Sequence, residues 1–488
     1  MALSSDEGRV VAAVRTDLFL GGVWQPSASG RTLPVDDPAT GEAIAEVADA
    51  TPEEGLEALR IAAEHQAAWA RTAPRERGEI LRRAFEIMTT RADDLALLMT
   101  LEMGKPVAES LGEVRYAAEF FRWFSEESVR VDGRFGLAPA GDSHLMVLRQ
   151  PVGPCLFITP WNFPLAMGTR KIGPAVAAGC TMVVKPAKQT PLSMLALAGI
   201  LAEAGLPEGV LSVLTTRSAS GLTAPMIKDA RLRKVSFTGS TEIGRMLVKD
   251  AADQLLRTSM ELGGNAPFLV FADADLDAAV EGAMIAKMRN MGEACTAANR
   301  FHVHASVADE FADRLAARMA ALKVGRGTEP GVQVGPLIDD AGREKVEDLV
   351  ADAADRGAAL LVGGSRLAGR GFFYAPTVLG GVERGARILT EEVFGPVAPV
   401  TTFETDDEAI EAANATEFGL VSYAFTQSWA RGMRLIEELQ AGMVGLNRGL
   451  VSNPAAPFGG IKQSGFGREG GPEGIHEYLD VKYVSTPR

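Results

Sequence analysis

From residue 152 onwards the chain alternates short apolar runs with helical segments, and this alternation limits the fold more than any other feature. The runs lie at 157–159, 181–184, 211–214 and 235–237, each bounded by Gly or Pro and followed by a helical pattern. Strands that alternate with helices pair as a parallel sheet with helices on its faces. A second series starts at 268–271, after a break at 261–265. The chain therefore predicts an α/β fold with two parallel-sheet units.

Helical patterns fill the first third of the chain. They lie at 52–69, 74–88, 93–103 and 113–125. Thr51 and Glu54 fit a capping box at the start of the first pattern, and Phe120, Phe121 and Phe124 are expected in the core. Two segments, at 129–148 and 478–485, fit neither series and are interpreted as exposed strands. Because an open strand edge can pair with another chain, we expect them to join subunits.

Charge and cysteine content exclude several classes of protein. The net charge of -14 disfavours nucleic acid and anionic membrane surfaces, since both bind basic patches. No run reaches the roughly 18 apolar residues of a membrane-spanning helix. No zinc-site spacing occurs, and His302 and His304 alternate as on one face of a strand, so no metal is expected. The sparse cysteines, Cys155, Cys180 and Cys295, indicate a reducing compartment, and we expect a cytoplasmic protein.

Cys295 ends the small-residue segment Asn-Met-Gly-Glu-Ala-Cys, just after the helix expected at 276–290. Backbone amides in such a loop can approach a substrate, and a thiolate there can attack a carbonyl carbon. A lone cysteine is more often a buried small apolar residue, which is how we interpret Cys155 and Cys180. From the loop alone, a nucleophile and a packed side chain are equally good interpretations of Cys295.

Four further motifs offer polar groups, and the first three have a structural alternative. Glu261 precedes two glycines, where partial burial would raise its pKa toward that of a general base, although a solvated acid is the commoner interpretation. Asn162 lies between two prolines and suits either an oxyanion or a simple turn. Lys185 and Lys188 end a strand where ligands gather, unless they form a surface pair. Ser240 ends a strand, glycine turn and helix start that suits phosphate, but the three-glycine fingerprint is absent.

In order and spacing these motifs resemble the aldehyde dehydrogenase superfamily over nearly the whole chain. The likeness is carried by Phe-Thr-Gly-Ser at 237–240, Glu-Leu-Gly-Gly-Asn at 261–265 with Cys295 following, Glu-Glu-Val-Phe-Gly-Pro at 391–396 and Pro-Phe-Gly-Gly at 457–460. The resemblance implies an aldehyde dehydrogenase-like fold. In that fold 1–128 and 149–260 bind the dinucleotide, 261–446 carry catalysis, and the hairpin 129–148 and tail 447–488 join subunits into a homodimer or homotetramer.

The resemblance also implies roles for the residues at matching positions. Cys295 would be the nucleophile, Glu261 the base that activates water to hydrolyse a thioester, and Asn162 with the Cys295 amide the oxyanion hole. Lys185 would act in both catalysis and cofactor binding. The cofactor would contact Ile158, Trp161, Lys185, Ala187, Lys188, Gly239, Ser240, Leu262, Glu392 and Phe394. A base at 261 favours release of the free acid over acyl transfer to coenzyme A.

Within the superfamily the chain resembles the succinate-semialdehyde dehydrogenases. The similar segments are Met-Gly-Thr-Arg-Lys at 167–171, Arg-Asn at 289–290 and Gly-Leu-Val-Ser-Asn at 449–453. Arg170, Arg289 and Ser452 would hold the distal carboxylate of the substrate, as guanidinium groups suit carboxylates, and structural ion pairs are the alternative. Glutaric semialdehyde would fit the same groups. NAD-preferring relatives often place Glu where this chain has Lys188, so NADP is the expected cofactor and NAD remains possible.

Two functions of other classes compete with this interpretation. A cofactor-free thiol hydrolase would pair Cys295 with a histidine, but the sequence offers only His302 or His304 along a strand and leaves the turns at Lys185 and Ser240 unexplained. A scaffold protein on the same fold is disfavoured because every expected catalytic residue type is present. The expected activity is therefore oxidation of a small aldehyde.

Overall fold

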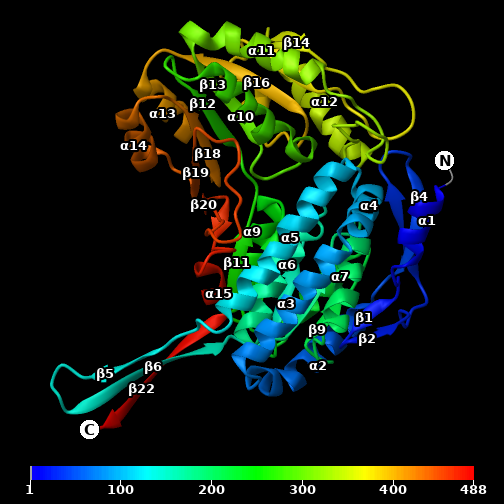
Figure 1. The fold of residues 1–488 in the computed structure, drawn as a ribbon, viewed down its shortest axis with the longest axis vertical. Helices are drawn as coiled ribbons and strands as arrows, with labels where there is room; N and C mark the ends of the chain where they lie inside the picture. The colour runs from blue at the N-terminus through cyan, green and yellow to red at the C-terminus, as the bar shows by residue number, and fades with distance from the viewer. Residues whose placement is uncertain (1–2) are drawn as a thin grey trace.

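Two sheets, each flanked by helices, form the body of the molecule (Figure 1). The computed structural model describes residues 3–488. The first sheet has eight strands in the order β2 (Val23–Gln25), β1 (Leu18–Leu20), β9 (Leu211–Val213), β8 (Met182–Lys185), β7 (Cys155–Ile158), β10 (Lys234–Thr238), β11 (Arg257–Glu261) and β21 (Gly465–Phe466). Its central strands β7 to β11 pair in parallel, and the outer pairs are antiparallel.

The second sheet has seven strands and begins right after the Gly-Gly link at 263–264. Its order is β14 (Ala359–Val362), β15 (Thr377–Gly380), β16 (Val397–Phe403), β13 (Ala298–His304), β12 (Ala266–Val270), β18 (Val421–Phe425) and β19 (Met443–Leu446). All of its pairs are parallel except β14 with β15. The two parallel-sheet units predicted from the strand–helix alternation are confirmed.

Helices fill the space around both sheets. Those of the first unit are α1 (Ser5–Ala12), α2 (Pro52–Ala70), α3 (Pro74–Thr90), α4 (Ala92–Met103), α5 (Val107–Glu127), α6 (Ala166–Ala178), α7 (Pro191–Glu203), α8 (Ala219–Ile227), α9 (Thr241–Ala252) and α15 (Glu473–His476). Those of the second are α10 (Leu276–Met288), α11 (Ala308–Ala320), α12 (Asp340–Asp355), α13 (Asp406–Asn414) and α14 (Trp429–Glu438), with short 3-10 turns η1 (Arg289–Gly292), η2 (Ala305–Val307) and η3 (Arg387–Leu389).

The local sequence signals in the first third of the chain correctly predicted a helix start and core residues. The capping box of Thr51 and Glu54 starts α2 as predicted. The three phenylalanines of α5 are fully buried, which confirms their place in the core. Two small antiparallel pairs lie outside the three larger sheets. They are β3 (Thr32–Asp37) with β4 (Glu42–Ala48), and β17 (Phe418–Gly419) with β20 (Ile461–Lys462).

A three-stranded sheet projects away from the body (Figure 1). It consists of β5 (Arg134–Leu137), β6 (Ser143–Pro151) and β22 (Leu479–Pro487), with β6 in the centre and both pairs antiparallel. Phe135, Val481 and Tyr483 expose 67%, 67% and 60% of their surface, which is unusual for large apolar side chains in a strand. The predicted hairpin and C-terminal strand are therefore present and pair with each other.

The expected tail at 447–488 needs a correction. Only β22 joins the hairpin, because β21 pairs antiparallel with β11 at the edge of the first sheet. Gly465 has a φ of +106°, and a side chain there would clash with the carbonyl oxygen of Met260. A short strand inside a glycine-rich stretch carries no apolar periodicity, so the pattern did not reveal it. Among the described residues no helix has the length and apolar character needed to cross a membrane.

Candidate active site

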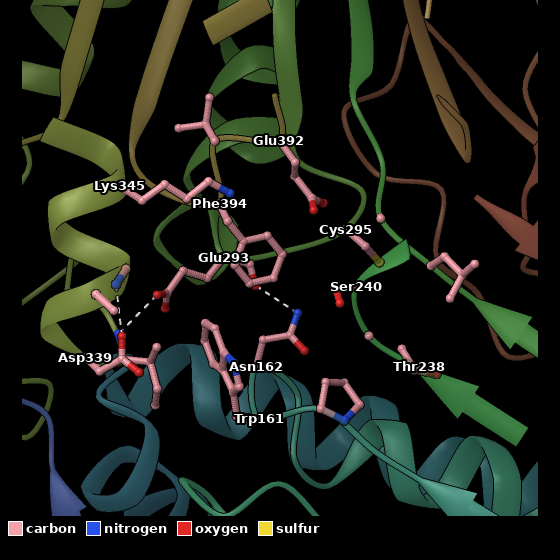
Figure 2. Close-up of a pocket in the computed structure, with 18 of the residues that line it drawn as sticks. Trp161, Asn162, Thr238, Ser240, Glu293, Cys295, Asp339, Lys345, Glu392 and Phe394 are labelled. Carbon is pink, nitrogen blue, oxygen red and sulfur yellow. Dashed lines mark hydrogen bonds between the residues drawn. The ribbon is translucent and has the colours of Figure 1, made fainter. Parts of the chain in front are cut away.

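A cavity of about 350 Å³ is lined by residues of both sheet units (Figure 2). Its wall comes from the loop after β7, the turn between β10 and α9, the Gly-Gly link, the loop after η1, the start of α12 and the segment 392–394. Of the residues predicted for the site, Trp161, Asn162, Gly239, Ser240, Leu262, Cys295, Glu392 and Phe394 line it. Residues far apart in sequence thus meet at the carboxyl ends of the central strands of the first sheet, where ligands bind in open α/β sheets.

Cys295 follows a left-handed turn of the chain. Asn290, Met291 and Gly292 have φ values of 54°, 54° and 80°, and such a conformation costs a non-glycine residue on the order of 1–3 kcal/mol. Gly292 packs so closely on the carbonyl oxygen of Gly395 that a side chain would clash. Burial raises the pKa of the Cys295 thiol to about 12. In the resting protein the thiol is protonated, so attack on a substrate requires a base.

Glu261 is the last residue of β11 and is 4% exposed. Neither oxygen of its carboxyl group has a hydrogen-bond partner among the described residues. Burial, and then the negative charge of Glu469, raise its pKa well above the usual range, although Arg170 opposes the shift. The Glu261 charge in turn raises the pKa of Cys295, so the two groups are electrostatically coupled. A buried carboxyl group with a raised pKa is a stronger proton acceptor than a solvated one, as a general base must be.

Asn162 belongs to the loop between β7 and α6, as its two flanking prolines suggested. Its side-chain amide donates to the main-chain oxygen of Glu293 at 2.9 Å (Figure 2). Asn290 donates to the same oxygen, also at 2.9 Å. The Asn162 amide therefore lies at the cavity wall and is bonded to Glu293, which precedes Cys295 by two residues. Its second N–H remains available for a developing oxyanion.

The Lys185 ammonium and the N-terminus of the helix that follows Ser240 are positive groups without a partner among the described residues. Lys185 ends β8, is 7% exposed, and makes no side-chain hydrogen bond or ion pair with any described residue. Burial lowers its pKa to about 8. Ser240 precedes α9 but does not cap it, so amide N–H groups of the first helical turn stay unsatisfied. An ammonium and a helix N-terminus without partners fit the ribose and phosphate groups of a dinucleotide.

The second sheet unit contributes Glu392 and Phe394 to the opposite wall (Figure 2). One Glu392 oxygen accepts from the amide N–H of Gly264 at 3.2 Å, and burial raises the pKa of the carboxyl group to about 7. The ring of Phe394 packs edge-on against Trp161 with centroids 5.4 Å apart. These contacts join the predicted cofactor residues of the two units across the cavity.

Four predicted cofactor residues, Ile158, Lys185, Ala187 and Lys188, lie outside this cavity wall. Ile158 and Ala187 are buried at the same sheet edge. Lys188 is exposed and lines a neighbouring groove of about 350 Å³ together with Arg217 and Asp339. Since Asp339 lines both spaces, the groove adjoins the cavity. The cofactor role of Lys188 stays a prediction.

The arginines predicted to bind a carboxylate differ in their surroundings. Arg170 is 2% exposed and forms an ion pair with Glu469 at 2.7 Å, which is the structural alternative that the sequence left open. Arg289 forms no ion pair with any described residue, and its guanidinium lies 4.8 Å from the ring centre of Phe163. Both cations lower the pKa of the Cys295 thiol. Ser452 is half-buried.

Three charged residues of the cavity wall were not predicted: Glu293, Asp339 and Lys345. Glu293 is 1% exposed, accepts from the Ile338 amide at 3.1 Å, and has a pKa raised well above the usual range by burial. Its position two residues before Cys295 was the sequence signal that could have identified it as a residue of the site. Asp339 caps α12 and was recognisable as a helix start.

No histidine lies in the cavity wall. His302 and His304 lie in β13, as predicted, and His302 bonds to the Thr401 hydroxyl at 2.7 Å. Burial lowers the pKa of His302 to about 3. A thiol hydrolase therefore has no histidine base here. Among residues 3–488 no group of three or more His, Cys, Asp or Glu is arranged to hold a metal ion.

The chain is similar to known proteins over nearly its whole length. A model of the aldehyde dehydrogenase family matches residues 24–484. A succinate-semialdehyde dehydrogenase of Paenarthrobacter nicotinovorans is 60% identical over 441 residues, which are 90% of this chain and 98% of that protein. A glutarate-semialdehyde dehydrogenase of Pseudomonas aeruginosa is 49% identical over 96% of this chain and 97% of its own length. A crystal structure of an E. coli NADP dependent enzyme has a TM-score of 0.96 at 46% identity, over 97% of this chain and 98% of that one. The chain belongs to the aldehyde dehydrogenase family.

Proposed function

We propose that this aldehyde dehydrogenase oxidises succinic semialdehyde, or a similar short anionic aldehyde, to the carboxylate with NADP as the preferred cofactor. The observation that carries the substrate is Arg289, a cation close enough to lower the Cys295 pKa. It forms no ion pair among the described residues, although its charge also opposes the rise that burial causes in the pKa of the Glu109 carboxyl group. A distal carboxylate would supply an ion-pair partner. The names of the relatives, with two dicarboxylic semialdehydes among them, support the same class.

In the proposed mechanism the chain supplies a nucleophile, an oxyanion hole and a base. Glu261 takes the thiol proton, and the Cys295 sulfur adds to the aldehyde carbon. The Asn162 amide and the Cys295 main-chain N–H donate to the oxygen that becomes negative. The bound cofactor supplies a hydride acceptor. Loss of a hydride from the carbon of the adduct leaves a thioester. Glu261 gives the thiol proton to solvent and, as a carboxylate again, removes a proton from water; the water oxygen attacks the thioester carbon, the carbon–sulfur bond breaks, and the acid leaves with Cys295 free again.

The residues that would hold the cofactor come from both units. Lys185 and Glu392 suit the ribose hydroxyls, Ser240 and the α9 N-terminus suit the pyrophosphate, and Trp161 with Phe394 closes the wall beside them. Lys188 lines the adjoining groove, where its ammonium would attract a 2′-phosphate and so favour NADP, although Asp36, Glu102 and Asp339 line the same groove.

A substrate panel tests this proposal. Purified enzyme is assayed with succinic semialdehyde, glutaric semialdehyde and uncharged butanal, each with NADP and with NAD, by the absorbance of the reduced nicotinamide. Arg289→Ala should lower kcat/KM for the anionic aldehydes by about 30-fold, the equivalent of about 2 kcal/mol for a charged hydrogen bond, and leave butanal unchanged. Equal losses on all three aldehydes would remove the carboxylate from the proposal.

We also propose that the enzyme is a cytoplasmic homo-oligomer. The exposed apolar side chains Phe135, Val481 and Tyr483 on the projecting sheet suit a subunit contact. The free thiols Cys155, Cys180 and Cys295 suit a reducing compartment.

A further inference from the structure

A buried ion pair lies outside the cavity, at the junction between α4 and α5. The Lys105 ammonium is 2.6 Å from the Glu113 carboxylate, and each side chain is only 1% exposed. Burying two charges is costly unless further hydrogen bonds satisfy their remaining donors and acceptors. The partners of this pair therefore indicate what it organises.

All of those partners belong to the loop that holds Asn162. Lys105 donates to the main-chain oxygen of Asn162 at 2.8 Å. The other oxygen of Glu113 accepts the amide N–H groups of Leu165 and Ala166, at 2.9 and 3.0 Å, where α6 begins. The ion pair thus holds the Asn162 loop at two points, one at the asparagine itself and one at the helix that follows.

The loop before Cys295 joins the same network. The side chain of Asn290 donates to the main-chain oxygen of Asn162 at 3.0 Å and to that of Glu293 at 2.9 Å. Glu109, between Lys105 and Glu113 in the chain, accepts the main-chain N–H of Asn290. The charged segment 105–113 therefore contacts both loops whose N–H groups would surround the substrate oxygen.

The second sheet unit packs directly on this junction. The amide N–H of Val107 donates to the Gly327 oxygen at 3.0 Å. A side chain at Gly327 would clash with the Lys105 oxygen, and one at Gly335 would clash with the Gly104 oxygen. Lys105 is thus enclosed between the two units, and neither can shift without disturbing its contacts.

We propose that Lys105, held by Glu113, is a positioning residue for the oxyanion hole. Its ammonium fixes the main chain of Asn162 so that the Asn162 amide faces the oxygen of a substrate bound to Cys295. Lys105 does not touch the substrate. This inference rests on the proposed roles of Cys295 and Asn162.

The test compares Lys105→Met with a matched control, Lys234→Met. Lys234 is equally buried, at 0% exposure, but lies at the start of β10, away from the cavity end of that strand. For each variant we would measure the pre-steady-state burst rate of reduced cofactor with succinic semialdehyde, NADP affinity by fluorescence, and the thermal midpoint. We expect Lys105→Met to slow the burst by about tenfold or more, since small misplacements of catalytic groups are that costly, with NADP affinity retained. Lys234→Met should keep the burst rate even at a similar loss of thermal midpoint.

A double-mutant cycle with Asn162→Ala separates positioning from general destabilisation. In the Asn162→Ala background, Lys105→Met should have almost no further effect on the burst, because the group that it positions is gone. The same fold loss in both backgrounds, or an equal burst loss in the Lys234 control, would overturn the inference. If Asn162→Ala itself leaves the burst unchanged, the proposed oxyanion hole fails instead. Should Lys105→Met not fold, Glu113→Gln, which keeps the shape of its partner, is examined in the same cycle.

Discussion

Replacing Lys185 by Met should make the cofactor-free enzyme more stable while it weakens cofactor binding. The side chain is 7% exposed without a hydrogen-bond or ion-pair partner among the described residues, and burial lowers its pKa from 10.5 to about 8. That difference, at about 1.4 kcal/mol per pKa unit, corresponds to a destabilisation of about 3 kcal/mol by the buried charge. Methionine fills a similar space without a charge.

The pH dependence distinguishes this effect from a simple packing gain. The unfolded chain binds the Lys185 proton up to pH 10.5 and the folded chain only up to about 8, so the unfavourable contribution is complete below pH 8 and fades as pH rises toward 10.5. In urea unfolding, Lys185→Met should exceed the wild type by about 3 kcal/mol at pH 7 and by only about half of that or less near pH 9.5. A variant that is less stable at pH 7, or a stability difference independent of pH, would refute the reasoning.

The remaining predictions concern turnover, cofactor choice and assembly. Cys295→Ala should abolish dehydrogenase turnover, and substantial residual oxidation would exclude it as the nucleophile. Glu261→Gln should slow the burst of reduced cofactor, which needs the thiol proton removed, and also the steady rate, which needs a proton removed from water; an unchanged steady rate would count against the base. The wild-type steady rate should rise with pH through the raised Glu261 pKa, because only the deprotonated carboxylate accepts a proton. Lys188→Glu should lower the ratio of kcat/KM for NADP to that for NAD, and a constant ratio contradicts its cofactor role. Val481→Lys with Tyr483→Lys should shift the protein toward monomers in sedimentation equilibrium, and unchanged assembly would exclude the projecting sheet as the contact.

Much of the fold was predictable because its signals are local. The capping box at Thr51 and the apolar runs that became β7 to β10 depend on neighbouring residues only. The predicted placement of Ser240 at a helix start and of Asn162 in a turn depended on the same kind of signal. Each of these positions follows from steric limits on a few consecutive residues.

Other features depend on partners that the sequence does not bring together. The pairing of Arg170 with Glu469 joins residues almost 300 positions apart, and no local pattern distinguishes it from an arginine awaiting a substrate. The same holds for Lys105 and Asn162, which only the packed interior joins. Burial decides the charge state of Glu293, and burial is a property of the whole fold.

The pairing of β21 with β11 has a consequence for synthesis of the chain on the ribosome. The strand that ends in Glu261 keeps an open edge until residues 465–466 have been made, after the whole second sheet. A nascent chain therefore exposes this edge, which is prone to pair with other chains, while the residues between 261 and 465 are synthesised. A truncated product that lacks the last few dozen residues would retain the nucleophile and the base but not the strand that covers the base. Residues 465–466 are thus the last strand of the first sheet to be synthesised.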